Sequence, residues 1–179
     1  DNSVLKVKLE DCNPELNRQE LKDNLIETMQ HYEGIGLSAN QLGVMERAFV
    51  MYNHVETKQI IAVFNPKIIK EGDEKVLIQE GCLSFPGLWV KVERSETIEV
   101  EYEDEKGEKI QRELYGLQSR IFQHEYDHME GSNFTEKVGK VKLDLALKKQ
   151  KKMNDLTEKL RKKTEENLAK NKEYQQLIS

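Results

Sequence analysis

The chain has 179 residues, of which 37% are hydrophobic and 34% charged, and its formal net charge is −5. This length fits one domain, and the apolar content is sufficient for a folded core. No apolar run approaches the roughly 18–20 residues that a membrane-spanning helix needs, which excludes a helical membrane protein. Two cysteines, Cys12 and Cys82, are too few for a disulfide scaffold and favour a reducing, cytoplasmic setting. Because the chain starts at Asp1 without a Met, we expect a trimmed N-terminus, and removal of a transit segment would instead indicate an organelle.

Charge is distributed unevenly along the chain. Residues 137–179 contain 13 of the 28 Lys and Arg residues but only 6 of the 33 Asp and Glu residues, a net charge of +7. The residues before this tail therefore carry a net charge of −12. A basic block of this kind is typical of a segment that contacts RNA or another anionic surface. The alternative is a solvated helix whose charges only keep the chain soluble.

The first third of the chain predicts one helix followed by an irregular passage. Asn17 and Glu20 resemble a capping box at a helix start. Apolar residues then recur at helical spacing and predict an amphipathic helix over residues 18–32. Gly34 and Gly36 follow, and two glycines so close together predict a tight passage that belongs to neither a helix nor a strand.

Short apolar runs in the middle of the chain predict strands. We expect Pro66 to separate one of these runs from the next apolar residues, Ile68 and Ile69. One run alternates strictly between apolar residues and Glu, which is typical of a half-buried antiparallel strand. The predicted strands are residues 48–52, 60–64, 76–78, 98–103 and 110–114.

Two further helices are predicted towards the C-terminus. The first runs from about Leu117 to near Gly131, and the second from about Val141 to Tyr174 because neither Gly nor Pro interrupts it. Apolar positions become sparse beyond Leu160, so we expect the last turns to project or fray. The apolar positions of the last helix are Leu143, Leu147, Met153, Leu156 and Leu160. Because strands and helices do not alternate in a βαβ manner, the chain predicts an α+β fold.

The sequence His124-Glu125-Tyr126-Asp127-His128 carries the clearest chemical signal. Positions i and i+4 share one face of a helix, so His124 and His128 can bind one metal ion. Glu125 then lies beside the metal, where it can accept a proton from water. Two histidines that happen to be four residues apart are the alternative, but this chain has only four histidines and a glutamate occupies the diagnostic position between these two.

A catalytic metal usually has three protein ligands, so the two histidines need a third. In one metalloprotease class the third ligand is a His six residues past the second, but Phe134 occupies that position here. A downstream carboxylate such as Glu136 is one candidate. Cys82 in Glu80-Gly81-Cys82-Leu83-Ser84 is another, since a thiolate binds borderline and soft divalent ions well. A lone cysteine in apolar surroundings is otherwise usually a small core residue.

Three segments together resemble the peptide deformylase family. Residues 34–41 resemble its first motif, Gly-x-Gly-x-Ala-Ala-x-Gln, although Ser38 replaces the first Ala. Residues 80–84 match the second motif, Glu-Gly-Cys-Leu-Ser, and residues 123–128 match the third, Gln-His-Glu-x-Asp-His. The resemblance covers about residues 1–150. It implies antiparallel sheets packed around a central metal-binding helix, with a catalytic domain over residues 1–140 and a basic helical tail over 141–179.

The resemblance also implies an activity, the removal of the N-formyl group from N-formylmethionine at the start of new polypeptides, with release of formate. Metal-activated hydroxide would attack the formyl carbon, with Glu125 taking the proton and passing it to the leaving amine. Gln41 and the backbone N–H of Leu83 would stabilise the oxyanion. The implied metal ligands are Cys82, His124 and His128.

Further roles follow from the same resemblance. The metal is expected to be Fe²⁺, with Zn²⁺, Ni²⁺ or Co²⁺ as alternatives that a Cys-His-His site also accepts. The substrate contacts would come from Gly34, Ile35, Gly36, Leu83 and Ile121. Gln123 and Asp127 would orient ligand imidazoles, and Glu80 with Arg94 would form either a supporting ion pair or two separate surface charges.

Two other functions are consistent with parts of this pattern. One is a metallopeptidase that uses the same helix motif with a downstream carboxylate. The other is a catalytically silent metal-stabilised module that docks on the ribosome through its basic tail. The presence of Glu125 and Gln41 argues against a silent module, since a purely structural metal site needs no general base.

Overall fold

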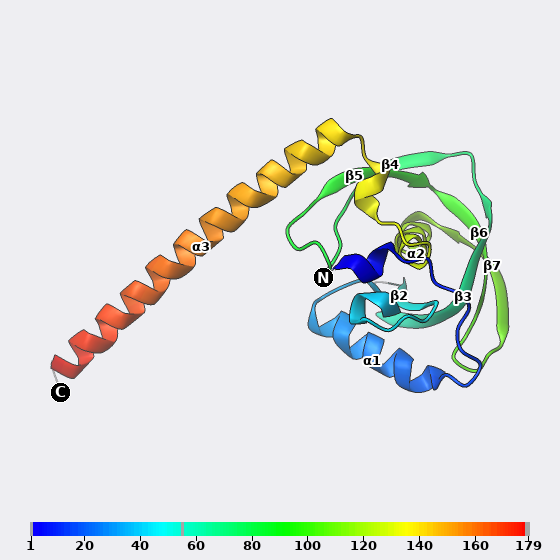
Figure 1. Ribbon diagram of the computed structural model, residues 1–179, viewed down its shortest axis with the longest axis horizontal. Helices are drawn as coiled ribbons and strands as arrows, with labels where there is room; N and C mark the ends of the chain where they lie inside the picture. The colour runs from blue at the N-terminus through cyan, green and yellow to red at the C-terminus, as the bar shows by residue number, and fades with distance from the viewer. Residues whose placement is uncertain (1, 55, 178–179) are drawn as a thin grey trace.

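The structure, a computed structural model, describes residues 2–54 and 56–177 (Figure 1). The α-helices are α1 (Arg18–His31), α2 (Gly116–Met129) and α3 (Lys140–Leu177), and the short 3-10 helices are η1 (Asn2–Lys6), η2 (Ala39–Leu42) and η3 (Phe134–Lys137). The strands are β1 (Gly36–Ser38), β2 (Ala48–His54), β3 (Gln59–Glu71), β4 (Lys75–Glu80), β5 (Val90–Ser95), β6 (Thr97–Glu103) and β7 (Lys109–Tyr115). These elements form two antiparallel sheets, so the predicted α+β fold is confirmed.

The larger sheet has the strand order β1-β2-β3-β6-β7, and β4 pairs with β5 in a separate two-stranded sheet. Figure 1 shows α2 at the centre, with the strands curving around it and α1 on the outside next to β2. The α2 helix contacts β1, β2, β5, β6 and β7. Because α2 is enclosed in this way, side chains on several of its faces are buried, which is the environment that the predicted metal-binding helix requires.

Strand β2 separates two hydrophobic cores, since side chains alternate between the two faces of a strand. Phe49 and Met51 pack in the core that includes α2, and Ala48 and Val50 pack in the core that includes α1. The α1 helix buries Leu21, Leu25 and Met29 in the second core. Burial of one such side chain stabilises the fold by about 1.5–3 kcal/mol.

The predicted N-terminal helix boundaries are confirmed to within one residue. Asn17 caps α1, and its side-chain oxygen accepts a hydrogen bond from Glu20 N. Such a cap satisfies a backbone N–H that has no partner within the helix. The central helix α2 likewise coincides with the predicted one, and Gly131 follows its end with φ 70°. A Cβ atom at position 131 would lie 2.8 Å from Lys6 O. Because Gly131 has no Cβ, the N-terminal segment can pass close by.

Two local predictions are wrong. Pro66 does not separate two strands, because β3 runs continuously from Gln59 to Glu71. The pairing register with β6 shifts between Phe64 and Lys67, and Asn65 has φ 50°, so the proline lies at a bulge where the ladder needs no N–H donor. The glycine-rich passage is also partly regular, since Gly36 opens β1 and pairs with Met51 of β2.

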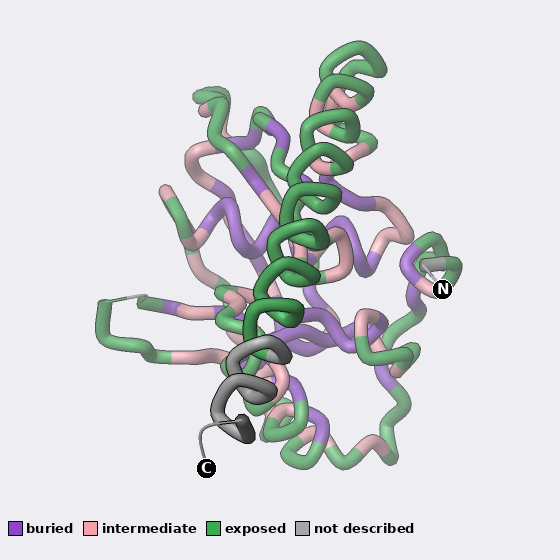
Figure 2. The backbone as a smooth tube through the Cα atoms, turned by 90° about the vertical axis from the view of Figure 1, so that its left-hand side faces the viewer, coloured by how far each residue is buried: buried purple, intermediate pink, exposed green. Residues whose placement is uncertain are grey.

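The helix α3 projects away from the rest of the chain in Figure 1, and Figure 2 shows that it is exposed along most of residues 141–168. Leu143 and Ala146 pack against a third hydrophobic cluster, and Gln150 Nε2 donates to Pro86 O at 2.7 Å. This cluster consists of Leu88, Val90, Val92 and Phe134. Residues 151–168 are all exposed, including Met153, so the projection begins earlier than the predicted last turns. Residues 178–179 of the predicted tail lie outside the described residues. Among the described helices, none has the length and apolarity that crossing a membrane requires.

Candidate metal centre

Three segments bring the candidate metal ligands together. Cys82 follows the end of β4, and His124 and His128 lie one turn apart on α2. The Sγ atom of Cys82 is 3.4 Å from His128 Nε2, and the two imidazole rings have centroids 5.3 Å apart at an interplanar angle of 82°. One ligand atom from each of the three residues lies within 4.8 Å of the others. This is the only such group of three or more potential ligands within residues 2–54 and 56–177.

The chemistry of these three donors fits a divalent transition metal. Metal–sulfur and metal–nitrogen bonds of about 2.3 and 2.0 Å place tetrahedral ligand atoms about 3.5 Å apart, and the Cys82–His128 separation of 3.4 Å agrees. Glu136, the other candidate for the third ligand, is not part of this group. Its carboxylate accepts hydrogen bonds from Ser132 Oγ and Asn133 Nδ2 instead. One sulfur and two nitrogens leave a fourth position for water or substrate.

The two imidazoles have very different proton affinities. Burial disfavours the charged form of His124, but hydrogen bonds to Cys82 and Glu80 outweigh it and raise its pKa to about 10. Burial, together with the positive charges of His124 and Arg94, lowers the pKa of His128 to about 3. At neutral pH the two imidazoles together therefore favour a single positive charge, carried by the proton on His124. A metal cation bound between them can supply positive charge in place of that proton.

Glu125 is buried beside the ligand group. Burial raises the pKa of its carboxyl to about 7, although the positive charges of His124 and Arg94 act in the opposite direction. Its Oε2 atom is buried and has no hydrogen-bond partner among the described residues. An unpartnered carboxylate oxygen with a pKa near neutrality is suited to accept a proton from a small molecule entering the site.

A buried ion cluster holds His124 in place. Glu80 Oε2 lies 3.0 Å from His124 Nδ1, which leaves the other ring nitrogen for a metal. Arg94 forms a bidentate pair with Glu80 at 2.7 and 2.9 Å, and Arg120 Nη1 adds a third contact at 2.6 Å. Burial opposes ionisation of Glu80, yet hydrogen bonds from His124 and Arg94 lower its pKa to about 2. Of the two alternatives for Glu80 and Arg94, an ion pair or two separate surface charges, the structure shows a buried ion pair.

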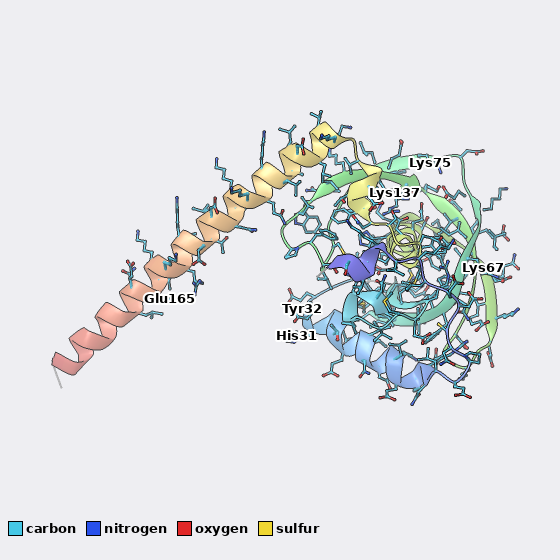
Figure 3. All side chains as sticks on the ribbon, viewed as in Figure 1. His31, Tyr32, Lys67, Lys75, Lys137 and Glu165 are labelled. Atoms are coloured by element: carbon cyan, nitrogen blue, oxygen red, sulfur yellow. The ribbon has the colours of Figure 1, made fainter. Side chains whose placement is uncertain are left out.

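The two residues expected to orient the imidazoles have other contacts. Asp127 accepts from Arg94 Nη1 at 2.9 Å and pairs with Lys137 at 3.0 Å, so it reaches His124 only through Arg94 and Glu80. Lys137 lies in η3, at the junction between α2 and α3 (Figure 3). Gln123 donates to Ser95 O at 2.9 Å and thereby joins α2 to β5. Glu80 is therefore the carboxylate that contacts a ligand imidazole.

Gln41 lies on the side of the site formed by η2. Its Nε2 atom is 3.4 Å from Cys82 Sγ and donates to Ser84 Oγ at 2.9 Å. Leu83 follows Cys82 directly, so its backbone amide is adjacent to a ligand. The two groups predicted to stabilise an oxyanion are thus close to the Cys-His-His group, as that role requires.

The glycine strand lies between the ligand helix and the Cys82 loop. A methyl group at Gly36 would lie 2.5 Å from Glu125 Oε1 and 2.9 Å from Ile121 Cγ2, and one at Gly34 would lie 2.9 Å from Leu83 Cδ1. Gly36 therefore needs to be glycine, because the groups that it meets are buried, whereas at Gly34 the exposed Leu83 side chain could move aside. Of the five predicted substrate contacts, Gly36 thus adjoins Ile121, which is buried, and Gly34 adjoins Leu83, which like Ile35 is exposed.

Some residues of the site were not predicted. Arg120 is buried and donates to Glu80 and to Val76 O, and its charge within an apolar helix face is the only signal for it in the sequence. Ser38 and Ser84 contact Gln41, but serines close to a glycine-rich segment indicate no particular partner. The contacts of Arg120 and Ser84 join segments at least 40 residues apart, which sequence spacing does not relate.

The fold and the site together define a class of protein, the metal-dependent hydrolases with a mononuclear Cys-His-His centre beside a glutamate. Comparison with known proteins identifies the family. The family profile described as polypeptide deformylase matches residues 1–144. A peptide deformylase of Thermotoga maritima is 41% identical over 133 residues, covering 74% of this chain and 79% of that protein. One of Rhizobium meliloti is 38% identical over 131 residues, covering 72% and 75%.

Solved structures agree with this assignment. A peptide deformylase of Plasmodium falciparum superposes with a TM-score of 0.77 at 32% identity, covering 86% of this chain and 92% of that one. The peptide deformylase of Synechococcus elongatus in complex with actinonin gives a TM-score of 0.78 at 34% identity, covering 84% and 83%. The chain belongs to the peptide deformylase family, as its three sequence motifs predict.

Proposed function

We propose that this protein removes the N-formyl group from N-formylmethionine at the start of nascent polypeptides and releases formate. Membership of the peptide deformylase family supports this reaction. The observation that carries the proposal is the buried Glu125, whose unpartnered oxygen lies beside a Cys-His-His group. A structural metal site has no need of such a group.

The proposed roles follow from the positions of the side chains. Cys82, His124 and His128 hold the metal, which when bound supplies a Lewis acid that lowers the pKa of water and polarises the formyl carbonyl. Glu125 takes the proton of the attacking water and passes it to the leaving amine nitrogen. Gln41 donates from Nε2 to the formyl oxygen as negative charge develops.

The backbone N–H of Leu83 is the second proposed donor to this oxygen. One donor of this kind contributes about 3–4 kcal/mol to transition-state stabilisation. We assign the contact with the peptide backbone to Gly34, Ile35 and Gly36, since an extended peptide can add to the edge of such a strand. Ile121, whose Cγ2 lies near Gly36 and Glu125, and Leu83 are assigned to the methionine side chain.

The proposed native metal is Fe²⁺, and Zn²⁺, Ni²⁺ and Co²⁺ are the alternatives that the same donors accept. A cytoplasmic setting is proposed because both cysteines are free thiols, as reducing compartments favour. We also propose that the basic tail contacts the ribosome, where formylated chains emerge. Its positive charge supports this contact, because ribosomal RNA is a polyanion.

Formate release from formyl-Met-Ala-Ser by metal-loaded protein, prepared without oxygen, tests the reaction. We expect Glu125→Gln to lower kcat at least about 100-fold while metal content is unchanged, because the substitution removes only the proton acceptor. Glu136→Gln, a glutamate variant outside the ligand group, should retain parental activity. Absence of formate with the metal-loaded parent, or full activity of Glu125→Gln, would contradict the proposal.

A further inference from the structure

The carboxamide of Gln41 is held at both of its ends. Its Oε1 atom accepts hydrogen bonds from the backbone N–H and from the hydroxyl of Ser38, each at 2.9 Å. At the other end, Nε2 donates to Ser84 Oγ at 2.9 Å and lies 3.4 Å from Cys82 Sγ. Two donors thus face the oxygen, and two acceptors face the nitrogen.

These contacts fix which end of the amide faces the ligand group. The Ser38 N–H can only donate, so the amide atom that it contacts must be the oxygen. The nitrogen is thereby turned towards Cys82. Of its two N–H groups, one is taken by Ser84 Oγ, and the other is on the side of Cys82 Sγ. A glutamine side chain that was not held in this way would lose rotamer freedom each time it bound the reacting oxygen, and that loss would oppose the contact.

We propose that Ser38 and Ser84 are positioning residues that clamp the Gln41 carboxamide, so that one N–H is presented to the reacting carbonyl oxygen. This inference rests on the proposed function, in which Gln41 stabilises the developing oxyanion. Neither serine touches the substrate in this account. Each acts by preorganising Gln41, which is the property that makes a hydrogen-bond donor effective in a transition state.

The surroundings of Ser38 support a dedicated role for its hydroxyl. The residue is fully buried, and its position is the one where the motif of similar sequences has Ala. The single hydroxyl proton can be donated either to Gln41 Oε1 or to Asn40 Oδ1, each at 2.9 Å, and Asn40 Nδ2 donates to His128 O at 2.9 Å. Ser38 therefore joins the glutamine to an amide that is itself anchored on the ligand helix, so the clamp is built into the packing of η2 against α2.

The test is a double-mutant cycle on formate release by the metal-loaded protein. Ser38→Ala and Ser84→Ala should each lower kcat about three- to tenfold, the effect of one hydrogen bond, and leave KM within about twofold. In a Gln41→Ala background, Ser84→Ala should not lower kcat further, because the group that it positions is gone. Ser38 also contacts the Glu125 carboxylate, so the Ser84 arm of the cycle is the one that isolates the clamp. The same substitutions should shift and broaden the side-chain amide resonances of Gln41 in ¹⁵N-labelled protein.

Two variants separate positioning from a general loss of packing. Ser84 lines a pocket of about 340 Å³, so Ser84→Thr has room for its methyl group and should restore kcat through its hydroxyl. Ser119 is as buried as Ser38, and its hydroxyl donates to Ser95 O, away from Gln41. Ser119→Ala should lower the free energy of unfolding about as much as Ser38→Ala does, because each removes one buried hydroxyl. It should leave kcat unchanged.

The outcomes are distinct. A further fall in kcat when Ser84→Ala is added to the Gln41→Ala background, an effect on KM alone, or unchanged Gln41 amide resonances would overturn the clamp. Parental kcat for both Ser38→Ala and Ser84→Ala would overturn it as well. An inactive metal-loaded parent would instead contradict the proposed function, and the amide resonances would still report whether the two serines hold Gln41.

Discussion

At the scale of single residues, the site depends on the absence of side chains as much as on their presence. Gly36 has no Cβ, and this leaves room for Glu125 and Ile121 against the backbone of β1. The close approach also excludes bulk water from one face of the carboxylate. The raised pKa of Glu125 follows from that burial, so the glycine and the proton acceptor form one unit.

A methyl group at Gly36 would lie 2.5 Å from Glu125 Oε1, closer than nonbonded atoms approach, so the carboxylate must move. We expect Gly36→Ala to lower kcat about 100-fold, because a displacement of about 1 Å has that effect on a positioned group. Metal content should be unchanged. Gly139→Ala is the matched control, since nothing lies within 4 Å of its added methyl group. Parental kcat in Gly36→Ala would show that Glu125 needs no fixed position.

The sequence predicts the ligands that are close together along the chain, and predicts the distant ones only by resemblance. His124 and His128 follow from helical spacing alone. Cys82 lies 42 residues before His124, and only its match to a family motif distinguished it from Glu136. For Arg94 the resemblance offered an ion pair with Glu80 only as one of two alternatives, and Arg120 was not predicted at all, because the burial of both arginines depends on how β5 packs against α2. Contacts of this kind are set by tertiary packing.

At the scale of elements, the helical spacing of apolar residues predicted the helices well. The expectations based on single Pro and Gly residues failed where pairing between strands determined the structure. Both α1 and α2 have a buried face with helical spacing, so their bounds were nearly correct. Pro66 was expected to end a strand, but a bulge accommodates it. Gly36 was expected to break regular structure, yet pairing with β2 makes it part of a strand. Propensity is a weak guide where neighbouring strands supply the hydrogen bonds.

The helix α3 concentrates its positive charge near the body of the protein. Residues 140–154 contain 6 Lys and one Asp, whereas residues 155–177 contain 6 Lys and Arg and 5 Asp and Glu. Figure 3 shows Glu165 on the projecting part, far from the sheets. If the tail contacts ribosomal RNA as proposed, the first half of the helix should carry most of the attraction.

Charge reversal in this first half tests the proposed ribosome contact. We expect ribosome affinity at about 0.1 M salt to fall at least about tenfold, with a smaller salt dependence, because phosphate contacts are lost. Deletion of residues 155–179 removes a net charge of only +1 and should have little effect. Turnover of short formylated peptides should be unchanged in both variants. Unchanged ribosome affinity after reversal would contradict the contact. The reversed residues are Lys148, Lys149, Lys151 and Lys152, all in the exposed or half-buried part of α3.

At the scale of the whole molecule, the fold brings three distant segments to one point. The loop after β4 supplies Cys82, η2 supplies Gln41, and α2 supplies both histidines and Glu125. The sheets enclose α2, and the cluster of Glu80, Arg94 and Arg120 joins β4 and β5 to that helix. Removal of one partner from such a buried ion pair costs about 3–5 kcal/mol, so the fold and the ligand geometry depend on the same contacts.

The central claim is that one sulfur and two nitrogens from this chain hold one divalent metal. Metal analysis and X-ray absorption of the zinc-loaded protein test it directly. We expect one zinc per chain with a sulfur shell at about 2.3 Å, lost in Cys82→Ala and retained in Cys12→Ala, whose buried thiol is not in the ligand group. A Cys82→Ala variant that keeps its metal and its activity would contradict the account and would instead indicate a carboxylate as third ligand.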